Sequence, residues 1–332
     1  MTPPNSLKPT EEIFDQTLRP KSLKDFNGQP TIKKNLEILV SASKNRNEPI
    51  DHILFYGPPG LGKTSLANVI ASEMGVSIRI TSGPAIERSG DLAAILTNLQ
   101  EGDILFIDEI HRLNKTVEET LYPAMEDFCL DIIVGKGPAA RSLRLDLPKF
   151  TIIGATTRIG AIASPLRDRF GAVYRLQFYN ETDLEKIILR SASILKLNIS
   201  KKAAAVLAKR SRRTPRIANR LLRRVRDFAE IKNNGVIDEQ ILGKALDFLE
   251  IDSNGLDHTD RQYLKTICHK YQGGPVGLET IATTMADDAS SVEEVCEPYL
   301  MQLGFVKRTK QGRVATKKAF DYLGKEKIPT LF

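Results

Sequence analysis

The stretch Gly57-Pro-Pro-Gly-Leu-Gly-Lys63-Thr64 decides the fold class of this chain. It fits the pattern Gly-x-x-x-x-Gly-Lys-Ser/Thr at every fixed position, follows a short apolar run at His52–Tyr56 and opens the helical spacing of Lys63–Met74. Glycines in such a loop allow backbone N–H groups to turn inward around phosphate oxygens, and the positive end of the following helix strengthens the attraction. The stretch predicts a strand, a phosphate-binding loop and a helix rather than a chance glycine-rich turn.

The acidic half of the same site is expected at the end of a second buried strand. Ile104-Leu-Phe-Ile107 is followed directly by Asp108 and Glu109. In phosphoryl transfer Lys63 reaches the β- and γ-phosphates, the Thr64 hydroxyl binds Mg²⁺, and Asp108 holds the ion, usually through water. Glu109 is placed to polarise the attacking water as general base. The pair of carboxylates therefore favours ATP hydrolysis over nucleotide binding alone.

Phosphoryl transfer also needs positive charge where the phosphate oxygens gain negative charge, and arginine is the best supplier. Arg158 follows a strand end, Arg169 precedes Phe-Gly in a polar segment, and Arg216 opens a helix after Thr-Pro. Single arginines are most often surface residues, so the residues alone leave the choice among these three open.

Alternating strand and helix patterns surround the motif. Further strands are expected at Ser77–Ile80, Asp103–Ile107 and Phe150–Ala155, and helices at Thr31–Ser43, Asp91–Leu99 and Val117–Glu126. This alternation predicts a mostly parallel sheet with helices on both faces. We therefore expect an α/β P-loop domain over residues 1–180.

Two segments depart from that alternation. Residues 130–147 alternate apolar and polar positions around Gly-Lys-Gly-Pro, which predicts a hairpin. Residues 181–252 carry no strand signal, and their apolar spacing predicts a small all-α domain. Its four expected helices are Glu181–Leu195, Lys201–Ser211, Pro215–Asn233 and Asp238–Leu249.

A third domain is expected over residues 253–332, after the polar break Asp252-Ser-Asn-Gly255. Its helices are expected at Asp257–Tyr271, Gly277–Met285 and Val292–Leu303, followed by a hairpin of Phe305–Arg308 and Arg313–Thr316 with its tip at Thr309–Gly312. Three helices followed by a basic hairpin are the pattern of a winged-helix DNA-binding domain.

Composition narrows the class of protein. With 332 residues, 41% of them hydrophobic and 27% charged, the chain can bury more than one core and is not disordered throughout. No apolar run has the length of a membrane span, and the first residues lack the pattern of a secretion signal. The three cysteines are scattered and not in metal-ligand spacing. We expect a soluble, cytoplasmic protein with no membrane partner.

The net charge of +7 is unevenly distributed along the chain. Residues 1–180 contain 21 basic and 21 acidic residues, whereas residues 181–252 contain 16 and 10. From residue 301 onward the sequence has 8 basic and 2 acidic residues. These two basic regions indicate either solvated faces or contact with a nucleic acid or another acidic partner.

The order of these motifs resembles that of the AAA+ ATPases, and within them the RuvB family of bacterial motors that drive branch migration of Holliday junctions. The stretches that carry this resemblance are Leu18-Arg-Pro, Gly57–Thr64, Asp103–Leu113, Tyr122–Phe128, Gly154–Gly171, Thr214–Glu230 and Gly273–Ala282. They span nearly the whole chain, so the resemblance implies the P-loop domain, an all-α lid domain and a C-terminal winged helix.

The resemblance implies a role in ATP binding and hydrolysis for individual residues. Thr156 would sense the γ-phosphate, Arg169 would project into the neighbouring subunit's site, and Arg216 would contact the nucleotide of its own subunit. The residues implied to bind nucleotide are Leu18, Arg19 and Tyr179 around the adenine, Gly60, Leu61, Gly62, Lys63, Thr64 and Ser65 around the phosphates and Mg²⁺, and Glu126, Asp127 and Phe128 between subunits.

The resemblance also implies partners. The hairpin at 130–147 matches the element on which the junction-binding protein RuvA docks, although its alternation alone fits an ordinary edge hairpin. A homohexameric ring on duplex DNA is implied, with the resolvase RuvC in the same complex. The implied processes are homologous recombination, DNA repair and the SOS response.

The terminal hairpin is expected to touch DNA. Lys307, Arg308, Lys310 and Arg313 flank its tight turn, so several cations are expected to project from one wing. Phosphate contacts of this kind give salt-sensitive binding that is independent of sequence. The family pattern places DNA contacts at Arg308 and Arg313. The other basic cluster, residues 212–226, carries periodic apolar residues and fits a helix face at a subunit contact.

Three positions depart from the family pattern. Arg213 stands where glycine is usual, which argues against a positive-φ turn before the helix of Arg216. The wing tip reads Thr309-Lys-Gln-Gly where a Pro-Arg pair is usual, so one phosphate contact moves to Lys310. Cys296 replaces a bulkier side chain, and its helical spacing predicts a core residue rather than a reactive thiol.

Two other functions fit parts of the sequence. A clamp-loader-like or initiator ATPase would use ATP as an assembly switch. A winged-helix transcription regulator would read DNA through Val292–Leu303, with Glu109 unused. That segment carries Glu293, Glu294 and Glu297 and no arginine, which weakens the regulator hypothesis.

Overall fold

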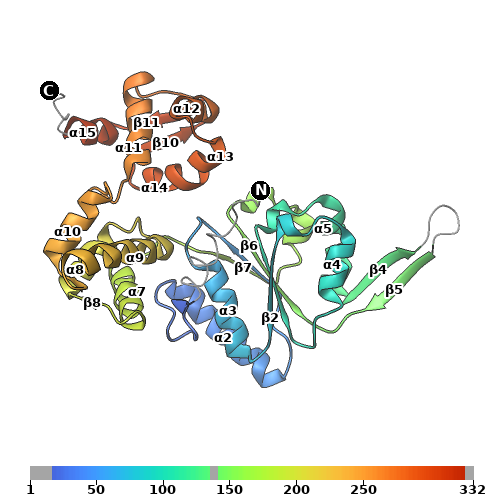
Figure 1. The fold of residues 1–332 in the computed structure, drawn as a ribbon. Helices are drawn as coiled ribbons and strands as arrows, with labels where there is room; N and C mark the ends of the chain where they lie inside the picture. The colour runs from blue at the N-terminus through green and yellow to red at the C-terminus, as the bar shows by residue number, and fades with distance from the viewer. Residues whose placement is uncertain (1–16, 135–140, 326–332) are drawn as a thin grey trace, which may run out of the picture. The chain divides into compact units, whose positions relative to one another are not determined.

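The computed structural model describes residues 17–134 and 141–325, which divide into two compact units after Tyr179. Figure 1 shows the elements of both units. No described helix combines the length and the apolar character that crossing a bilayer requires.

The first unit is built on a five-stranded sheet in the order β2-β3-β6-β1-β7, with every pair parallel. The strands are β1 (Ile53–Tyr56), β2 (Ile78–Ser82), β3 (Ile104–Asp108), β6 (Thr151–Thr156) and β7 (Ala172–Arg175). The expected parallel sheet is confirmed. The edge strand β7 was not expected, because its alternating exposed positions follow a polar loop and give no apolar run.

Helices cover both faces of this sheet (Figure 1). On one face lie α2 (Pro30–Arg46) and α3 (Lys63–Met74), and on the other α4 (Ser89–Leu96) and α5 (Lys115–Glu126). The second face contains a hydrophobic core in which α4 and α5 pack on the strands. Buried residues that represent it are Leu54, Leu92, Leu105, Leu121 and Ile152. This packing fixes the strand ends that carry the motif residues.

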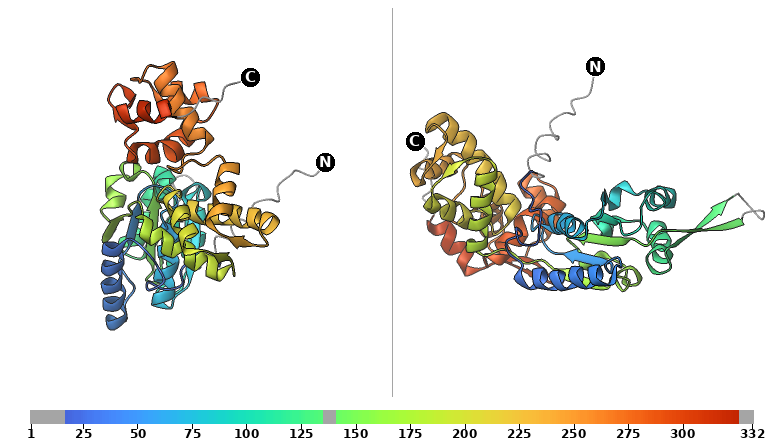
Figure 2. Two further views of the ribbon diagram at one scale, coloured as in Figure 1. Left: turned by 90° about the vertical axis from the view of Figure 1, so that its left-hand side faces the viewer. Right: turned by 90° about the horizontal axis from the view of Figure 1, so that it is seen from below.

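A hairpin of β4 (Cys129–Val134) and β5 (Arg141–Asp146) leaves this unit after α5. Its antiparallel register pairs Cys129 with Asp146 and Val134 with Arg141. In Figures 1 and 2 it extends away from the sheet, so the expected hairpin at 130–147 is confirmed as a projecting element. Residues 135–140 at its tip lie outside the described residues.

The second unit begins with the expected four helices. They are α7 (Glu181–Ile194), α8 (Lys201–Lys209), α9 (Pro215–Lys232) and α10 (Glu239–Phe248). Asn180, Ser200 and Asp238 cap three of them through side-chain oxygens that accept backbone N–H groups. The expectation of no strand here is wrong in one detail, since β8 (Asn198–Ile199) pairs with β9 (Val236–Ile237) in parallel. Two residues per strand are too few to leave a period in the sequence.

The winged-helix pattern follows in the same unit. Its elements are α11 (His258–Lys265), a π-helical turn (Thr266–Lys270), α12 (Leu278–Met285), α13 (Ala289–Ser291), a second π-helical turn (Val292–Cys296), α14 (Glu297–Gln302), β10 (Val306–Thr309), β11 (Gly312–Ala315) and α15 (Lys317–Lys325). The final helix α15 was not expected. Its buried Ala319 and Leu323 are four residues apart and join the core of this region.

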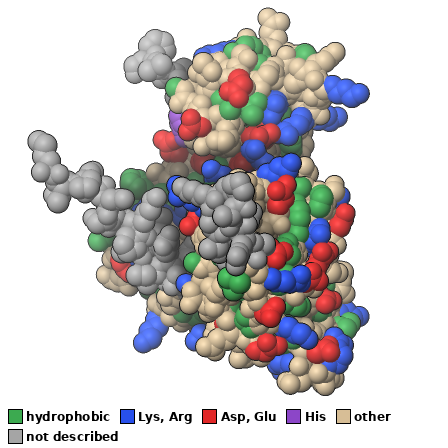
Figure 3. Space-filling model, turned by 90° about the vertical axis from the view of Figure 1, so that its right-hand side faces the viewer, with side chains coloured by type: hydrophobic (Ala, Val, Ile, Leu, Met, Phe, Trp, Pro, Cys, Tyr) green, Lys and Arg blue, Asp and Glu red, His purple; other side chains and the backbone are tan. Residues whose placement is uncertain are grey.

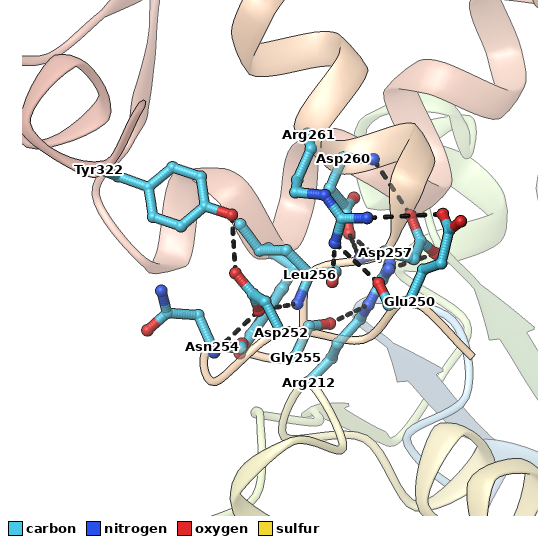
Figure 4. Close-up of polar contacts among 11 residues, drawn as sticks. Arg212, Glu250, Asp252, Asn254, Gly255, Leu256, Asp257, Asp260, Arg261 and Tyr322 are labelled. Atoms are coloured by element: carbon cyan, nitrogen blue, oxygen red, sulfur yellow. Dashed lines mark hydrogen bonds and ion pairs between the residues drawn. The ribbon is translucent and has the colours of Figure 1, made fainter. Parts of the chain in front are cut away.

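A network of polar contacts joins the four-helix part to the winged-helix part (Figure 4). Arg212 is 7% exposed, and its Nε donates to the Gly255 carbonyl at 3.0 Å. Its Nη2 lies 2.5 Å from Asp257 Oδ2 and also pairs with Asp260. One guanidinium thus holds two carboxylates of the next domain, and the expected break at 252–255 is a fixed joint.

Further contacts hold the connecting segment from the other side. Arg261 donates to the carbonyls of Glu250 and Leu256 at 2.7 and 3.1 Å, and Tyr322 donates to Asp252 Oδ2 at 2.7 Å. Burial raises the pKa of Asp260 to about 7, with Asp257 adding to the rise and Arg212 opposing it. The two acids therefore compete for a single cation.

Arg213 and Cys296 both depart from the family pattern; the structure contradicts the expectation for Arg213 and confirms that for Cys296. Arg213 has φ +54° and its neighbour Arg212 has φ +49°, so the positive-φ turn forms without glycine and that expectation is wrong. The buried contacts of Arg212 hold the turn in this conformation. Cys296 is 4% exposed, and burial raises its thiol pKa to about 12, which confirms a core residue.

Candidate functional site

Three motif segments meet at one edge of the parallel sheet. Tyr56, which precedes the phosphate loop, is the register partner of Thr156, and Ile107 pairs with Gly154. The Gly57 N–H donates to the Thr156 carbonyl at 3.2 Å. The loop after β1, the acids after β3 and the polar end of β6 therefore lie at the carboxyl ends of neighbouring strands, where open α/β sheets bind ligands.

The phosphate loop has the backbone that its glycines predict. Gly57 has φ +138°, and a Cβ at this position would lie 2.6 Å from the Leu176 carbonyl oxygen, so only glycine fits. Gly62 has φ +98° at the N-terminus of α3. Lys63 is 8% exposed, and its Nζ donates to the carbonyls of Gly57 and Pro58 at 2.8 and 3.0 Å. These two carbonyl contacts place the ammonium beside the phosphate loop.

The backbone turns sharply at Asp108 and Glu109, at the end of β3. The Glu109 N–H donates to Asp108 Oδ1 at 2.9 Å, and Glu109 itself has φ +48°. A Cβ on Gly83 would lie 2.4 Å from the Glu109 carbonyl oxygen, so this turn requires glycine opposite it. The Glu109 side chain is 42% exposed, and its Oε2 lies 3.0 Å from Arg112 Nη1. The carboxylate is accessible to water and is paired with a neighbour.

Polar groups at the end of β6 face the same edge. The Thr156 hydroxyl lies 2.9 Å from His111 Nδ1 and accepts the Arg158 N–H at 2.9 Å. Thr157 carries a buried hydroxyl that has no hydrogen-bond partner among the described residues. The end of β6 thus carries the Thr156 hydroxyl, which is hydrogen-bonded, and the Thr157 hydroxyl, which has no partner among the described residues.

The residues expected around an adenine are partly brought together. The Tyr179 hydroxyl donates to the Leu61 carbonyl at 3.1 Å, and its ring lies against Gly28, where a Cβ would meet ring carbon Cε1 at 2.3 Å. Leu18 is buried and Arg19 is half-buried. Tyr179 therefore lies directly beside the phosphate loop, as its expected role requires.

The residues expected between subunits cluster within one subunit. Arg169 Nη2 lies 3.0 Å from Glu126 Oε2, its Nη1 donates to the Pro165 carbonyl at 2.6 Å, and its guanidinium carbon lies 4.4 Å from the Tyr122 ring centroid. Asp127 lies 3.5 Å from Arg144 of the hairpin. In this structure Arg169 is held by its own chain.

The cations expected on the wing differ strongly in exposure. Lys307 and Lys310 are exposed, and Arg308 has a side chain that is 47% exposed. The Arg313 side chain is only 13% exposed, because it turns back onto Glu297. Of the four expected cations, Lys307, Lys310 and Arg308 are exposed on the wing, and Arg313 is mostly buried. Arg216 is exposed in the first turn of α9, after Pro215.

Three protein-family models match consecutive parts of this chain. Family models match residues 18–176 as the Holliday junction DNA helicase RuvB P-loop domain, 179–252 as the RuvB AAA lid domain and 253–324 as the RuvB C-terminal winged helix domain. Together the matches cover most of the chain. The chain belongs to the RuvB family. This membership does not favour a clamp-loader-like switch.

Solved structures of a RuvB protein are similar over nearly the whole length. The Thermotoga maritima RuvB Holliday junction branch migration motor is 50% identical with a TM-score of 0.85, over 94% of this chain and all of that one. Two single-residue variants of that protein are also 50% identical, with TM-scores of 0.86, over 94% of this chain and 99% of theirs. The domain set predicted for a RuvB-family chain is thus present.

The RuvB-family site fits a magnesium nucleotide by the chemistry of its donors. The Thr64 hydroxyl opens α3, and the Asp108 carboxylate ends β3, so both candidate ligands are oxygens, which Mg²⁺ prefers. Among the described residues, no group of three or more His, Cys, Asp or Glu side chains could hold a metal ion. The donor set therefore agrees with a RuvB-type ATP site.

Sequence reasoning missed three residues that contact candidate site residues. Arg112 pairs with Glu109, His111 contacts Thr156, and Tyr122 packs on Arg169. His111 and Arg112 follow Glu109 in the short helix Ile110–Arg112, so their spacing from the acidic pair was the available signal. No local pattern links Tyr122 to Arg169, which lie far apart in the chain.

Acidic and basic side chains are interspersed on the face of the P-loop unit shown in Figure 3. This mixture agrees with the equal numbers of acidic and basic residues in residues 1–180. A single-sign patch of the kind that attracts DNA is not visible on this face of the described residues.

Proposed function

We propose that this chain is the ATP-hydrolysing subunit of a hexameric ring that drives branch migration of Holliday junctions. The observation that carries the proposal is the consecutive match of three RuvB family models over residues 18–324. A motor of this class must hold duplex DNA without reading its sequence, and must convert ATP hydrolysis into movement. The proposed setting is recombination and repair in the cytoplasm, including the SOS response.

The phosphate loop would bind ATP through backbone N–H groups and Lys63. Lys63 Nζ donates to the carbonyl oxygens of Gly57 and Pro58, which places the ammonium at the loop that would surround the β- and γ-phosphates. Thr64 and Asp108 would hold Mg²⁺, which supplies neutralising charge to the phosphate oxygens when bound. Gly60, Leu61, Gly62 and Ser65 would complete the loop, with Leu18, Arg19 and Tyr179 around the base.

Glu109 would act as general base for the attacking water. Its side chain is 42% exposed at the end of β3, where water can reach the carboxylate. The ion pair with Arg112 at 3.0 Å would have to loosen before the carboxylate turns to that water. Thr156 would sense the γ-phosphate next to it, with Arg216 contacting the nucleotide from the lid.

The complete site would require a second copy of the chain. Arg169 would leave its contacts with Glu126 and Tyr122 and reach the γ-phosphate of the neighbouring subunit, with Glu126, Asp127 and Phe128 at the same seam. An arginine supplied in this way stabilises the charge that develops on the transferring phosphoryl group. The proximity of Glu126 to Arg169 supports one common surface for both.

DNA and protein partners would bind to separate elements. The wing, with Lys307, Arg308, Lys310 and Arg313, would contact phosphates of duplex DNA at a Holliday junction. The projecting hairpin at 130–147 would dock RuvA, with RuvC joining the same assembly. The exposure of Leu143, at 50%, supports an apolar contact on that hairpin.

A migration assay tests the motor function directly. A synthetic four-way junction is incubated with the chain and ATP, with and without a RuvA-type partner, and the resolved duplexes are quantified. We expect migration with ATP and none with a non-hydrolysable analogue. Normal ATP turnover without any junction migration under all conditions would contradict the motor and favour an ATP switch.

Mixed rings test the shared site. Lys63→Ala removes the ATP-binding half of a seam and Arg169→Ala removes the half supplied by the neighbour. Mixing the two variants should restore part of the ATPase activity, because some seams then combine two intact halves. The control mixes each variant with itself at the same total concentration. No recovery at any ratio would contradict a site built by two subunits.

A further inference from the structure

The acidic residues of segment 292–303 have no role in the functions considered so far. Glu297 begins α14 and is 1% exposed, and burying a carboxylate requires compensating donors. Three side chains supply them, since Tyr263 donates to Oε1 at 3.0 Å, Arg313 donates to both oxygens, and Arg308 donates to Oε2 at 2.9 Å. Glu297 is therefore the centre of the wing's polar contacts.

One edge of the Arg313 guanidinium donates hydrogen bonds to this carboxylate. Its Nε lies 2.7 Å from Glu297 Oε1 and its Nη2 lies 3.2 Å from Oε2, which is a bidentate pair. Its backbone is also fixed, because its N–H and carbonyl bond to Val276 at 2.8 and 3.0 Å. With 13% of its side chain exposed, Arg313 has little surface left for a phosphate.

Arg308 presents the opposite arrangement. Its Nη2 donates to Glu293 Oε1 at 2.8 Å and to Glu297 Oε2 at 2.9 Å. Within residues 17–134 and 141–325, its Nε and Nη1 have no hydrogen-bond partner, and 47% of the side chain is exposed. The hydrogen bond to Glu297 raises the pKa of Arg308, so the guanidinium remains charged. These donors are free for an anion.

We propose that Glu297 is a positioning residue for DNA binding, which orients Arg308 toward a DNA phosphate while Arg313 neutralises the Glu297 carboxylate. The inference rests on the proposed function, because it assumes that the wing binds duplex DNA. It changes one of the wing contacts proposed above: Arg308 contacts phosphate, whereas Arg313 acts through Glu297 and does not itself contact phosphate.

Glu293 has the opposite effect on the same arginine. It is 28% exposed, compared with 1% for Glu297, and it shares Nη2 of Arg308. A partly solvated carboxylate at this place repels an approaching phosphate and competes with it for Arg308. Glu293 Oε1 also lies 3.6 Å from Arg313 Nη2, so the two glutamates contact the same two arginines and differ in burial and in how closely they hold Arg313.

Two matched substitutions separate positioning from charge. Glu293→Gln and Glu297→Gln each remove one negative charge beside Arg308, so charge alone predicts tighter DNA binding for both. We expect Glu293→Gln to raise affinity about 2- to 5-fold and Glu297→Gln to lower it about 3- to 10-fold, since a phosphate contact loses its ordered arginine. The amide nitrogen introduced by Glu297→Gln would also face arginine donors, which moves both arginines.

The measurement uses the full chain with a non-hydrolysable ATP analogue and a labelled duplex of about 30 bp and arbitrary sequence, long enough for several phosphate contacts. Fluorescence anisotropy gives the affinity at several salt concentrations. We expect Glu297→Gln to reduce the magnitude of the salt slope by about 0.9, the value for one phosphate. On an Arg308→Ala background, Glu297→Gln should cause no further loss of affinity. A purely structural role would add its loss to that of Arg308→Ala.

The outcomes distinguish this inference from the proposed function. If Arg308→Ala leaves the affinity and the salt slope unchanged, the wing does not bind DNA through this residue and the proposed DNA contact fails. If Arg308→Ala weakens binding while Glu297→Gln strengthens it, charge outweighs positioning and the inference is overturned.

A second variant covers the case in which Glu297→Gln does not fold. Glu297→Met combined with Arg313→Met replaces a buried ion pair by apolar side chains of similar length, a change that proteins often tolerate. The net charge is unchanged, so charge alone predicts no effect on affinity. We expect the same loss as for Glu297→Gln and a salt slope reduced by about one phosphate. Unchanged binding in this folded variant would overturn the inference.

Discussion

The phosphate loop and the wing both hold cations for an anionic partner, but they hold them by different means. Lys63 is held by the carbonyl oxygens of Gly57 and Pro58, whereas Arg313 is held by the Glu297 carboxylate. A carbonyl fixes the position of a cation and leaves its charge intact. A carboxylate fixes the position and cancels the charge. The first arrangement suits direct contact with phosphate. Arg313 gives both Nε and Nη2 to the carboxylate and is suited to support, whereas Arg308, within the described residues, gives only Nη2 and keeps Nε and Nη1 for a phosphate.

The difference also separates the two regions by how they are encoded. The phosphate loop works through backbone conformation, so glycine spacing in the sequence reports it directly. The wing works through side chains that come from α11, α14, β10 and β11. Such partners are distant in the sequence and leave no local pattern.

The largest expected effect tests the cation held by carbonyls. Lys63→Ala removes the ammonium that would bind the β- and γ-phosphates, and we expect ATP affinity to fall by about 10³-fold, because two charge-assisted hydrogen bonds are lost. Titration of a fluorescent ATP analogue measures the change. Lys115→Ala is the matched control in the same unit, since that side chain is 89% exposed. Equal affinities for both variants would remove the basis for the comparison.

Features that local sequence determines were predicted, and features that depend on tertiary neighbours were not. Lys63–Met74 was predicted with the bounds of α3, and the acidic pair lies at the end of β3, with Asp108 as the last residue of the strand and Glu109 directly after it. Apolar periodicity and glycine positions determine such features locally. The edge strand β7 and the contacts of Arg313 with Glu297 were not predicted. They depend on tertiary neighbours, as does the positive φ of Arg213, which local preference for glycine argued against.

Hydrolysis provides the next largest effect. Glu109→Gln keeps the shape of the side chain but cannot accept the proton, so we expect ATP turnover to fall by about 10²- to 10³-fold with ATP affinity nearly unchanged. Phosphate release under single-turnover conditions measures the step. Arg112→Ala is the informative companion, because it removes only the ion partner at 3.0 Å and should retain turnover. Full activity of Glu109→Gln would assign the base elsewhere.

Arg212 is a cation held by two carboxylates, those of Asp257 and Asp260, at the connection between the four-helix part and the winged-helix part. Burial raises the pKa of Asp260 to about 7, above the ordinary 3.8, so between about pH 4 and pH 7 the native chain keeps a proton that the unfolded chain has released. The native state therefore loses stability as pH rises through this window, by at most about 1.4 kcal/mol per pH unit. Asp260→Asn has no such proton.

Urea unfolding monitored by circular dichroism measures this effect. We expect Asp260→Asn to gain stability relative to the unmodified chain as pH rises from about 4 to 7. Asp247→Asn, on the exposed surface of α10, is the control and should show no such trend. The opposite trend would indicate that Asp260 is ionised in the native chain and that Arg212 lowers its pKa.

The smallest expected effect is on duplex affinity, when an exposed lysine of the wing that forms no ion pair among the described residues is removed. Lys307 and Lys310 are exposed, and no ion pair joins either to another residue in the described part of the chain. Both side chains are solvated, unlike the buried Lys63. Lys310→Ala should therefore weaken duplex binding only a few-fold, equally for unrelated sequences, and lower the magnitude of the salt slope by about 0.9. Anisotropy titrations on two unrelated duplexes measure both quantities, with Lys115→Ala as the control. A loss confined to one duplex would mean that the wing reads bases, which a motor that moves along any sequence cannot use.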